Sequence, residues 1–224
     1  IMGCSYHIAR SEGSTDEELS QAAGLCHSPM THSFGHMTTY PTIINGSKVV
    51  LTERYDPGEA LEFIEKEKLT GMSGTPAHIV GLLNHPDFDK RDTSSIVNVG
   101  VGGAPVPVKL IKDIQEKLGA FVVNTYGMGE TIGHTKTRLD DPPELIFETV
   151  GKAVPGAEVG IFDDNRKEML PPGERGEIAY LGAYLFIAYY KEPERTEETR
   201  NADGWFFTGD LGTLDEKGYL RLTG

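Results

Sequence analysis

The sequence is poor in cysteine, in basic charge and in long apolar runs. Cys4 and Cys26 are its only cysteines, too few for a disulfide framework or a metal quartet, and they predict a reducing compartment, the cytosol. Its 21 Lys and Arg against 34 Asp and Glu give a net charge of −13, which argues against a nucleic-acid partner because phosphate binding needs a basic face. The longest uncharged apolar run, residues 179–190, is too short for a transmembrane segment, which needs about 20 residues.

Metal-binding patterns are also scarce. His32 and His36 are spaced as in a metal-binding His-x-x-x-His helix, but no third ligand and no glutamate directly after His32 accompany them. We therefore expect no histidine metal site.

The chain up to about residue 135 alternates short apolar strands with amphipathic helices. Strands are predicted at residues 48–52, 96–101 and 120–125. Helices are predicted at residues 57–68, where Asp56 is the N-cap and Pro57 opens the helix, and at residues 107–118. Strand, helix and strand at this spacing indicate an α/β fold with a parallel sheet and flanking helices.

The pattern changes after about residue 148. Short β-rich runs occupy residues 158–162, 177–181, 205–208 and 219–222, with one short helix at residues 193–200. The expected fold is thus an α/β layer followed by a smaller antiparallel β region. We place an α/β subdomain at residues 1–147 and a β-rich subdomain at residues 148–224.

Two predicted strand ends carry residues suited to ligand binding, because ligands bind beyond the carboxyl ends of parallel strands. At residues 101–105, two adjacent glycines let a flat ligand approach the backbone, although a plain strand-to-helix turn is the alternative. Residues 124–131 combine a tyrosine, two glycines and a glutamate, which can stack on a base, approach a phosphate and hold Mg²⁺. A glycine-rich loop with a chance glutamate is the alternative there.

A third segment, residues 203–211, closes an aromatic run with Thr208-Gly209-Asp210. A carboxylate at such a bend can accept hydrogen bonds from both hydroxyls of a ribose. The alternative is an aspartate that only caps the turn.

In this order and at these separations, the three segments resemble the adenylate-forming, or AMP-binding, superfamily. It comprises acyl- and aryl-CoA synthetases, the adenylation domains of peptide synthetases and beetle luciferases. Residues 29–35 (Pro-Met-Thr-His-Ser-Phe-Gly) also resemble the Pro-Leu-x-His-x-Phe-Gly segment of the family. Residues 173–178 and 189–190 resemble its Gly-Glu-Ile strand and Gly-Tyr, and residues 218–224 resemble the strand before its interdomain hinge. The resemblance covers essentially the whole chain.

The resemblance implies roles for individual residues. The implied nucleotide-binding residues are Gly102, Gly103, Ala104, Tyr126, Gly127, Met128, Gly129, Thr131 and Asp210. Among them Tyr126 would stack on adenine and Asp210 would bind the ribose. Glu130 would be the catalytic residue that holds Mg²⁺. The residues implied beside the acid substrate are His32, Phe34, Gly35 and Val101.

The chain departs from the family pattern at Gly129, where the family has a threonine that contacts the α-phosphate; Thr131 lies two residues further on. The family's phosphate loop ends in Pro-Lys-Gly, but residues 11–15 contain no lysine and are typical of a helix cap. We expect the phosphate loop, the hinge and the small C-terminal domain to lie outside these 224 residues, which would then be an internal fragment of the large N-terminal domain.

The implied reaction is that of an acyl-CoA ligase. The carboxylate of an organic acid attacks the α-phosphate of ATP, with Mg²⁺ present, which gives an acyl-adenylate and releases pyrophosphate. The thiol of CoA then displaces AMP from the acyl-adenylate. Apolar residues near the expected pocket favour an aliphatic or aromatic acid: Met72, Val99, Val101, Met128 and Ile132. The alternatives are an adenylating enzyme with another acceptor and a non-catalytic nucleotide-binding or interaction fragment. An NAD enzyme is disfavoured, because no Gly-x-Gly-x-x-Gly follows a first strand.

Overall fold

The structure, a computed structural model, describes residues 15–224. The chain forms two compact units, Ile1–Asn124 and Thr125–Gly224. The division falls within a strand, whereas the change of sequence pattern comes after residue 147.

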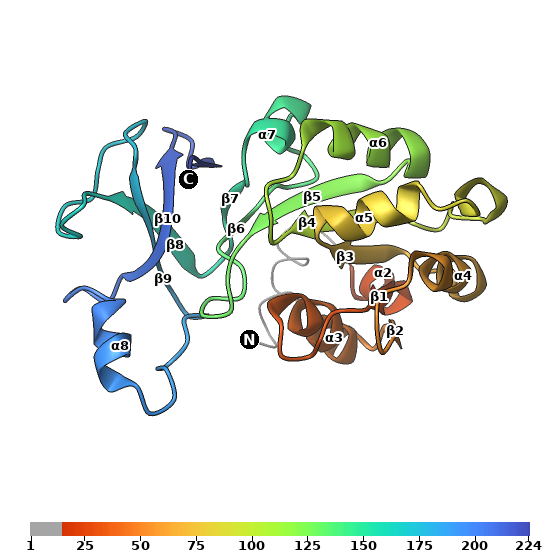
Figure 1. Cartoon of the computed structure of the whole chain (residues 1–224), viewed down its shortest axis with the longest axis horizontal. Helices are drawn as coiled ribbons and strands as arrows, with labels where there is room; N and C mark the ends of the chain where they lie inside the picture. The colour runs from red at the N-terminus through yellow and green to blue at the C-terminus, as the bar shows by residue number, and fades with distance from the viewer. Residues whose placement is uncertain (1–14) are drawn as a thin grey trace. The chain divides into compact units, whose positions relative to one another are not determined.

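Parallel strands form the centre of the first unit (Figure 1). Their order is β2 (Lys48–Leu51), β1 (Ala23–Cys26), β3 (Gly71–Gly74) and β4 (Asn98–Gly102). Strand β5 (Phe121–Tyr126) begins in this unit, where Phe121 N donates to Val97 O, and ends in the second. All four parallel strands end at one edge of the sheet.

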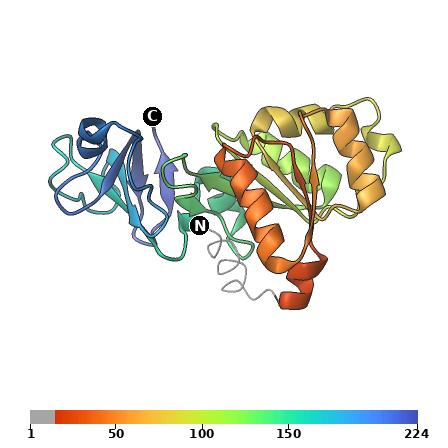
Figure 2. The same cartoon turned by 90° about the horizontal axis from the view of Figure 1, so that it is seen from below.

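Helices cover both faces of these strands (Figure 2). The helices are α2 (Asp16–Gln21), α3 (Ser33–Asn45), α4 (Pro57–Glu67), α5 (Pro76–Leu83) and α6 (Val108–Leu118), with a 3₁₀ turn at Phe88–Lys90. Helix α3 lies on one face, and α4, α5 and α6 lie on the other. Buried side chains make the core on that second face: Leu25, Leu61, Ile64, Met72, Ile79, Leu82, Val99, Ile111 and Ile114.

Local signals in the sequence explain where these helices begin and end. Asp56 Oδ1 accepts a hydrogen bond from Glu59 N at 2.9 Å, which caps α4 as predicted. Thr15 and Glu18 form a capping box at the start of α2. Helix α6 ends at Gly119, whose φ of 63° favours glycine.

The second unit is mostly antiparallel β structure. Strand β6 (Thr135–Lys136) pairs with the end of β5 and with β7 (Lys152–Ala153), and helix α7 (Pro143–Glu148) lies between β6 and β7 in the chain. A separate four-stranded sheet has the order β11 (Leu220–Leu222), β10 (Phe206–Leu214), β9 (Gly176–Gly182) and β8 (Ala157–Phe162). Helix α8 (Pro193–Glu198) connects β9 with β10.

The predicted fold class, a parallel α/β layer followed by an antiparallel β region, is confirmed. The helices and strands that were not predicted include β1, α3, β3 and α5 of the first unit and β6, α7 and β7 of the second. Strand β3 has the sequence Gly-Met-Ser-Gly and therefore shows no apolar run that marks a strand. Strand β10 is longer than predicted, since a bulge between Phe207 and Leu211 lets it continue past Asp210. No helix among residues 15–224 is long and apolar enough to cross a membrane.

Candidate functional site

The carboxyl edge of the first unit brings together two of the predicted segments. Gly103 follows β4 with a φ of 74°, a conformation that favours glycine. Phe34 Cε2 lies 3.5 Å from the position that a Cβ on Gly103 would take, and Ala104 follows in an exposed turn. Phe34, predicted beside the acid, therefore lies next to Gly103, which is predicted to bind the nucleotide.

The start of α3 fixes the other residues predicted near the acid. His32 is the exposed N-cap of the helix, and its Nδ1 accepts a hydrogen bond from Phe34 N at 3.1 Å. The His32 and Phe34 rings stack with centroids 5.6 Å apart. Gly35 is required by packing, because a Cβ there would lie 2.3 Å from Pro29 O. Val101 is fully buried in the core.

His32 and His36 each stack on a different aromatic ring, and that of His32 is Phe34. The His36 ring instead stacks on Tyr40 at 5.0 Å. Among residues 15–224, no group of three or more His, Cys, Asp or Glu side chains is placed to hold a metal ion. Cys26 is a buried free thiol, whereas Cys4 lies outside the described residues.

An aromatic cluster that the sequence did not predict lies at the same edge. The rings of His27, Tyr55 and His78 have centroids 4.6–4.7 Å apart. His78 Nδ1 accepts from Thr75 N at 3.2 Å, so His27 Nε2, 3.3 Å away, is the donor of that pair. Burial, followed by the charge of His78, lowers the pKa of His27 to about 4. His27 and His78 are 51 residues apart, so no local pattern marks the cluster.

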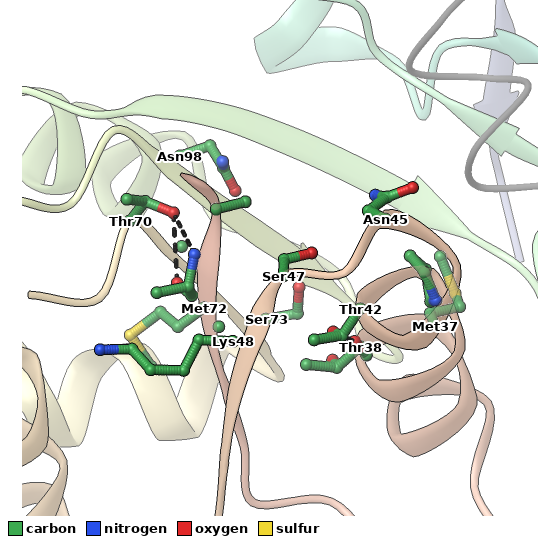
Figure 3. Close-up of a pocket in the computed structure, with 15 residues that line it drawn as sticks. Met37, Thr38, Thr42, Asn45, Ser47, Lys48, Thr70, Met72, Ser73 and Asn98 are labelled. Atoms are coloured by element: carbon green, nitrogen blue, oxygen red, sulfur yellow. Dashed lines mark hydrogen bonds between the residues drawn. The ribbon is translucent and has the colours of Figure 1, made fainter. Parts of the chain in front are cut away.

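A pocket at the opposite ends of these strands contains none of the residues predicted to bind the nucleotide or Mg²⁺ (Figure 3). Met72, which was predicted near the acid pocket, lines this pocket instead. The pocket has a volume of about 230 Å³ and lies between α3 and the amino ends of the sheet. Thr38, Thr42, Asn45, Ser73 and Asn98 are among its lining residues. Its position at the amino ends separates it from the edge where α/β sheets bind ligands.

The Tyr-Gly-Met-Gly-Glu segment forms the tight loop between β5 and β6 in the second unit. A Cβ on Gly127 would lie 2.5 Å from Ile132 O, so only glycine allows the chain to fold back there. Ile132 has a φ of 67°, a strained conformation for a β-branched residue, and its N donates to Met128 O at 2.8 Å. This loop leaves Gly129 exposed and Glu130 half-buried.

Gly129 and Thr131 face different surroundings. A Cβ on Gly129 would meet no described atom within 4 Å. Thr131 is fully buried, and its Oγ1 has no hydrogen-bond partner among the described residues. The Thr131 hydroxyl therefore lies in the interior of the unit, while the open position is that of Gly129.

Tyr126 and Asp210 from two predicted segments contact each other directly. The Tyr126 hydroxyl donates to Asp210 Oδ2 at 2.6 Å. Burial, followed by this hydrogen bond, raises the pKa of the Tyr126 phenol, so it stays protonated as the donor. Behind Tyr126, the buried His134 ring packs at 4.8 Å, and burial lowers the pKa of His134 to about 3, which keeps that ring neutral.

The bulge in β10 places the Asp210 carboxylate. Gly209 adopts a φ of 80°, and its N donates to Glu177 Oε1 at 3.0 Å. Thr208 Oγ1 donates to Ile178 O at 2.9 Å and accepts from Asp210 N at 3.1 Å. The two residues before Asp210, Thr208 and Gly209, are thus both hydrogen-bonded to strand β9, and this places the Asp210 carboxylate at the bend.

Glu130 is held by residues 186–189, which have no predicted role in binding. The Tyr189 hydroxyl donates to Glu130 Oε1 at 2.7 Å, and Phe186 N donates to Glu130 O at 2.7 Å. Burial, followed by the hydrogen bond to Glu130, raises the pKa of Tyr189. The second oxygen, Oε2, accepts no hydrogen bond from the described residues. A carboxylate oxygen of this kind fits Mg²⁺, which proteins bind through one or two carboxylates together with substrate phosphates.

Comparison with known proteins identifies relatives of this chain. Residues 3–190 match the family model described as AMP-binding enzyme. A relative from Rhodococcus jostii (strain RHA1), 3-[(3aS,4S,7aS)-7a-methyl-1,5-dioxo-octahydro-1H-inden-4-yl]propanoyl:CoA ligase, is 35% identical over 98% of this chain and 41% of its own length. The chain therefore spans about two fifths of that relative.

Solved structures show the same fold. ATP-bound MatB from Rhodopseudomonas palustris has a TM-score of 0.85 and 27% identity over 98% of this chain and 42% of its own. The amide bond synthetase McbA from Marinactinospora thermotolerans has a TM-score of 0.86 and 32% identity over 100% of this chain and 44% of its own. Because residues 3–190 match its model, the chain belongs to the AMP-binding enzyme family.

Proposed function

We propose that the chain is part of an ATP-dependent ligase that activates an aliphatic or aromatic carboxylic acid as an acyl-adenylate, releases pyrophosphate and transfers the acyl group to CoA. The observation that carries this proposal is the hydrogen bond between Tyr126 and Asp210. These residues come from two predicted nucleotide segments 84 positions apart. Their contact supports a shared role in binding one nucleoside.

The roles proposed for the second unit follow from hydrogen-bonding capacity. An ionised carboxylate has about four acceptor sites. Tyr126 uses one of them on Asp210, so sites remain for the two ribose hydroxyls. Glu130 is proposed to hold Mg²⁺ through Oε2. When bound, Mg²⁺ neutralises part of the negative charge on the phosphates of ATP.

The roles proposed for the first unit are steric. Gly102 and Gly103 let the ligand approach the backbone after β4, and the Phe34 ring is the apolar surface nearest Gly103. His32 is exposed, and its ring is oriented by the hydrogen bond from Phe34 N and by stacking on Phe34. An apolar ring and a nearby imidazole suit the tail and the carboxylate of an organic acid, respectively.

The acyl acceptor separates two versions of this proposal. CoA is favoured by the His-x-Phe-Gly segment and by the relative named as a CoA ligase. A nitrogen acceptor is the second candidate, because the similar structure of McbA is named as an amide bond synthetase.

Two assays on the enzyme that contains this chain test the proposal. Acid-dependent pyrophosphate release, with hydroxylamine to trap the adenylate, is expected for some members of a panel of aliphatic and aromatic acids. Adding CoA or an amine then identifies the acceptor from the product. Pyrophosphate release that no acid stimulates would contradict the proposed adenylation, whereas amide formation without thioester would replace only the CoA step.

A further inference from the structure

A contact of Tyr189 connects two segments of the second unit that lie far apart in the sequence. Tyr189 follows β9 and Glu130 follows β5, 59 residues earlier, and the phenol donates to Glu130 Oε1 at 2.7 Å. The same segment holds the Glu130 backbone, because Phe186 N donates to Glu130 O at 2.7 Å. Glu130 is therefore fixed at both its main chain and its side chain by residues 186–189.

The Tyr189 ring is itself held on several sides. The backbone N of Tyr189 donates to Thr196 Oγ1 at 3.0 Å. The Arg195 guanidinium lies 4.3 Å from the ring centroid, and the Phe186 ring packs against it with centroids 4.7 Å apart. The phenol consequently reaches Glu130 from a position that is fixed before any ligand binds.

A neutral phenol orients a carboxylate without removing its charge. An arginine or lysine at the same place would neutralise Glu130 and weaken its attraction for a cation. With Oε1 occupied by Tyr189, Oε2 is the oxygen without a hydrogen bond from the described residues. Groups that orient metal-binding side chains in this way typically change metal affinity about 10- to 100-fold when they are removed.

We infer that Tyr189 is a positioning residue for Glu130, which it holds so that one carboxylate oxygen stays free for the Mg²⁺ that accompanies ATP. This inference rests on the proposed function, in which Glu130 binds that ion. Tyr189 touches neither ATP nor the acid in this role and acts only through the carboxylate.

The test compares Tyr189→Phe with Tyr190→Phe in the enzyme that contains this chain. Both variants lose one phenol oxygen and keep the ring. Tyr190 is 85% exposed, and its hydroxyl makes no hydrogen bond to the described residues, so it is a matched control. Mn²⁺ binding, measured by electron paramagnetic resonance with α,β-methylene ATP present, gives a readout that does not depend on turnover. The Mg²⁺ dependence of pyrophosphate release gives a second.

For Tyr189→Phe we expect a half-saturating cation concentration about tenfold higher in both measurements, with kcat at saturating Mg²⁺ within about twofold of the unchanged enzyme. Tyr190→Phe should leave both midpoints unchanged. Equal midpoints for Tyr189→Phe and Tyr190→Phe would overturn the inference. A loss of kcat that excess Mg²⁺ does not restore would also overturn it, because it would show a merely structural role.

A third variant separates this inference from the proposed function. Glu130→Gln should raise the cation midpoint further, and adding Tyr189→Phe to it should change little, since the phenol then has no carboxylate to orient. If Glu130→Gln leaves the midpoint unchanged, the proposed role of Glu130 fails and the inference fails with it. If Glu130→Gln raises the midpoint but Tyr189→Phe does not, only the inference fails.

Discussion

Replacing Asp210 by asparagine tests the proposed ribose site with little change of shape. The asparagine oxygen can still accept the hydrogen bond that Tyr126 donates to Asp210 at 2.6 Å. The negative charge and two acceptor sites are lost, however, because the amide nitrogen only donates. The variant thus removes charge-assisted acceptance of the ribose hydroxyls while keeping the contact that orders the site.

The expected loss follows from the strength of hydrogen bonds to charged groups. Such a bond contributes about 1.5–3 kcal/mol, which corresponds to about a 10- to 150-fold rise in the KM for ATP if one effective bond is lost. Because binding of the acid does not involve this carboxylate, the KM for the acid should change by less than about threefold. The assay is acid-dependent pyrophosphate release over a range of ATP concentrations.

A nucleotide with one hydroxyl removed makes the test specific. The unchanged enzyme should use 2′-deoxy-ATP less well than ATP, and Asp210→Asn should reduce that preference, since the hydroxyl has then lost its acceptor. Asp203→Asn, which removes an exposed carboxylate seven positions earlier in the same segment, is the control and should behave as the unchanged enzyme. Equal preference for ATP over 2′-deoxy-ATP in all three proteins would refute the assignment.

Four further outcomes are expected. Glu130→Gln should raise the half-saturating Mg²⁺ concentration by about tenfold or more in a magnesium titration of pyrophosphate release, because a neutral amide is a poorer ligand for a hard cation. Gly129→Thr should fold normally, because a Cβ there meets no described atom within 4 Å, and should speed adenylate formation up to about tenfold in a hydroxamate assay; a slower variant would contradict this reasoning. The pKa of His27, lowered to about 4, means that the unfolded chain binds a proton more readily than the folded chain below pH 6.5. His27 should therefore lower the free energy of unfolding by about 1.6 kcal/mol between pH 6.5 and pH 5, in addition to the fall caused by the buried His134, and urea titrations of His27→Gln should show a fall smaller by about that amount. The 224-residue chain tested alone should form no acyl-hydroxamate above a boiled control, because its sequence contains no Pro-Lys-Gly, the end of the phosphate loop that the family resemblance assigns to the reaction.

Elements that depend on local sequence were predictable, and those that depend on tertiary contacts were not. Helix α4 has an N-cap, a proline in its first turn and an apolar face, and each of these signals lies within a few residues. Strands β1 and β3 are only four residues long and rich in glycine, so neighbouring strands, rather than their own sequence, make them strands. Their burial between helices could not be deduced without the sheet.

The residues of the candidate site also separate into those that local sequence predicts and those that depend on tertiary contacts. The glycines at residues 103, 127 and 209 were visible in the sequence, because a chain reversal or a positive φ demands glycine locally. Tyr189 was visible only as part of a Gly-Tyr resemblance, since its contact with Glu130 joins positions 59 residues apart. The cluster of His27, Tyr55 and His78 follows three different strands in the chain and has no sequence signal.

The two carboxylates of the second unit that are proposed to bind ligands are both oriented by a tyrosine. Asp210 and Glu130 each accept a hydrogen bond from a tyrosine that belongs to another segment, at 2.6 Å and 2.7 Å. In both pairs the phenol has a raised pKa, so it remains a donor and leaves the carboxylate its full charge. The orientation of both carboxylates is then set during folding, so the binding of ATP does not have to restrict their rotamers, which otherwise costs up to about 2 kcal/mol for a glutamate. Because each tyrosine acts through its carboxylate, the effects of substituting both members of a pair should be less than additive, whereas substitutions in the two different pairs should add.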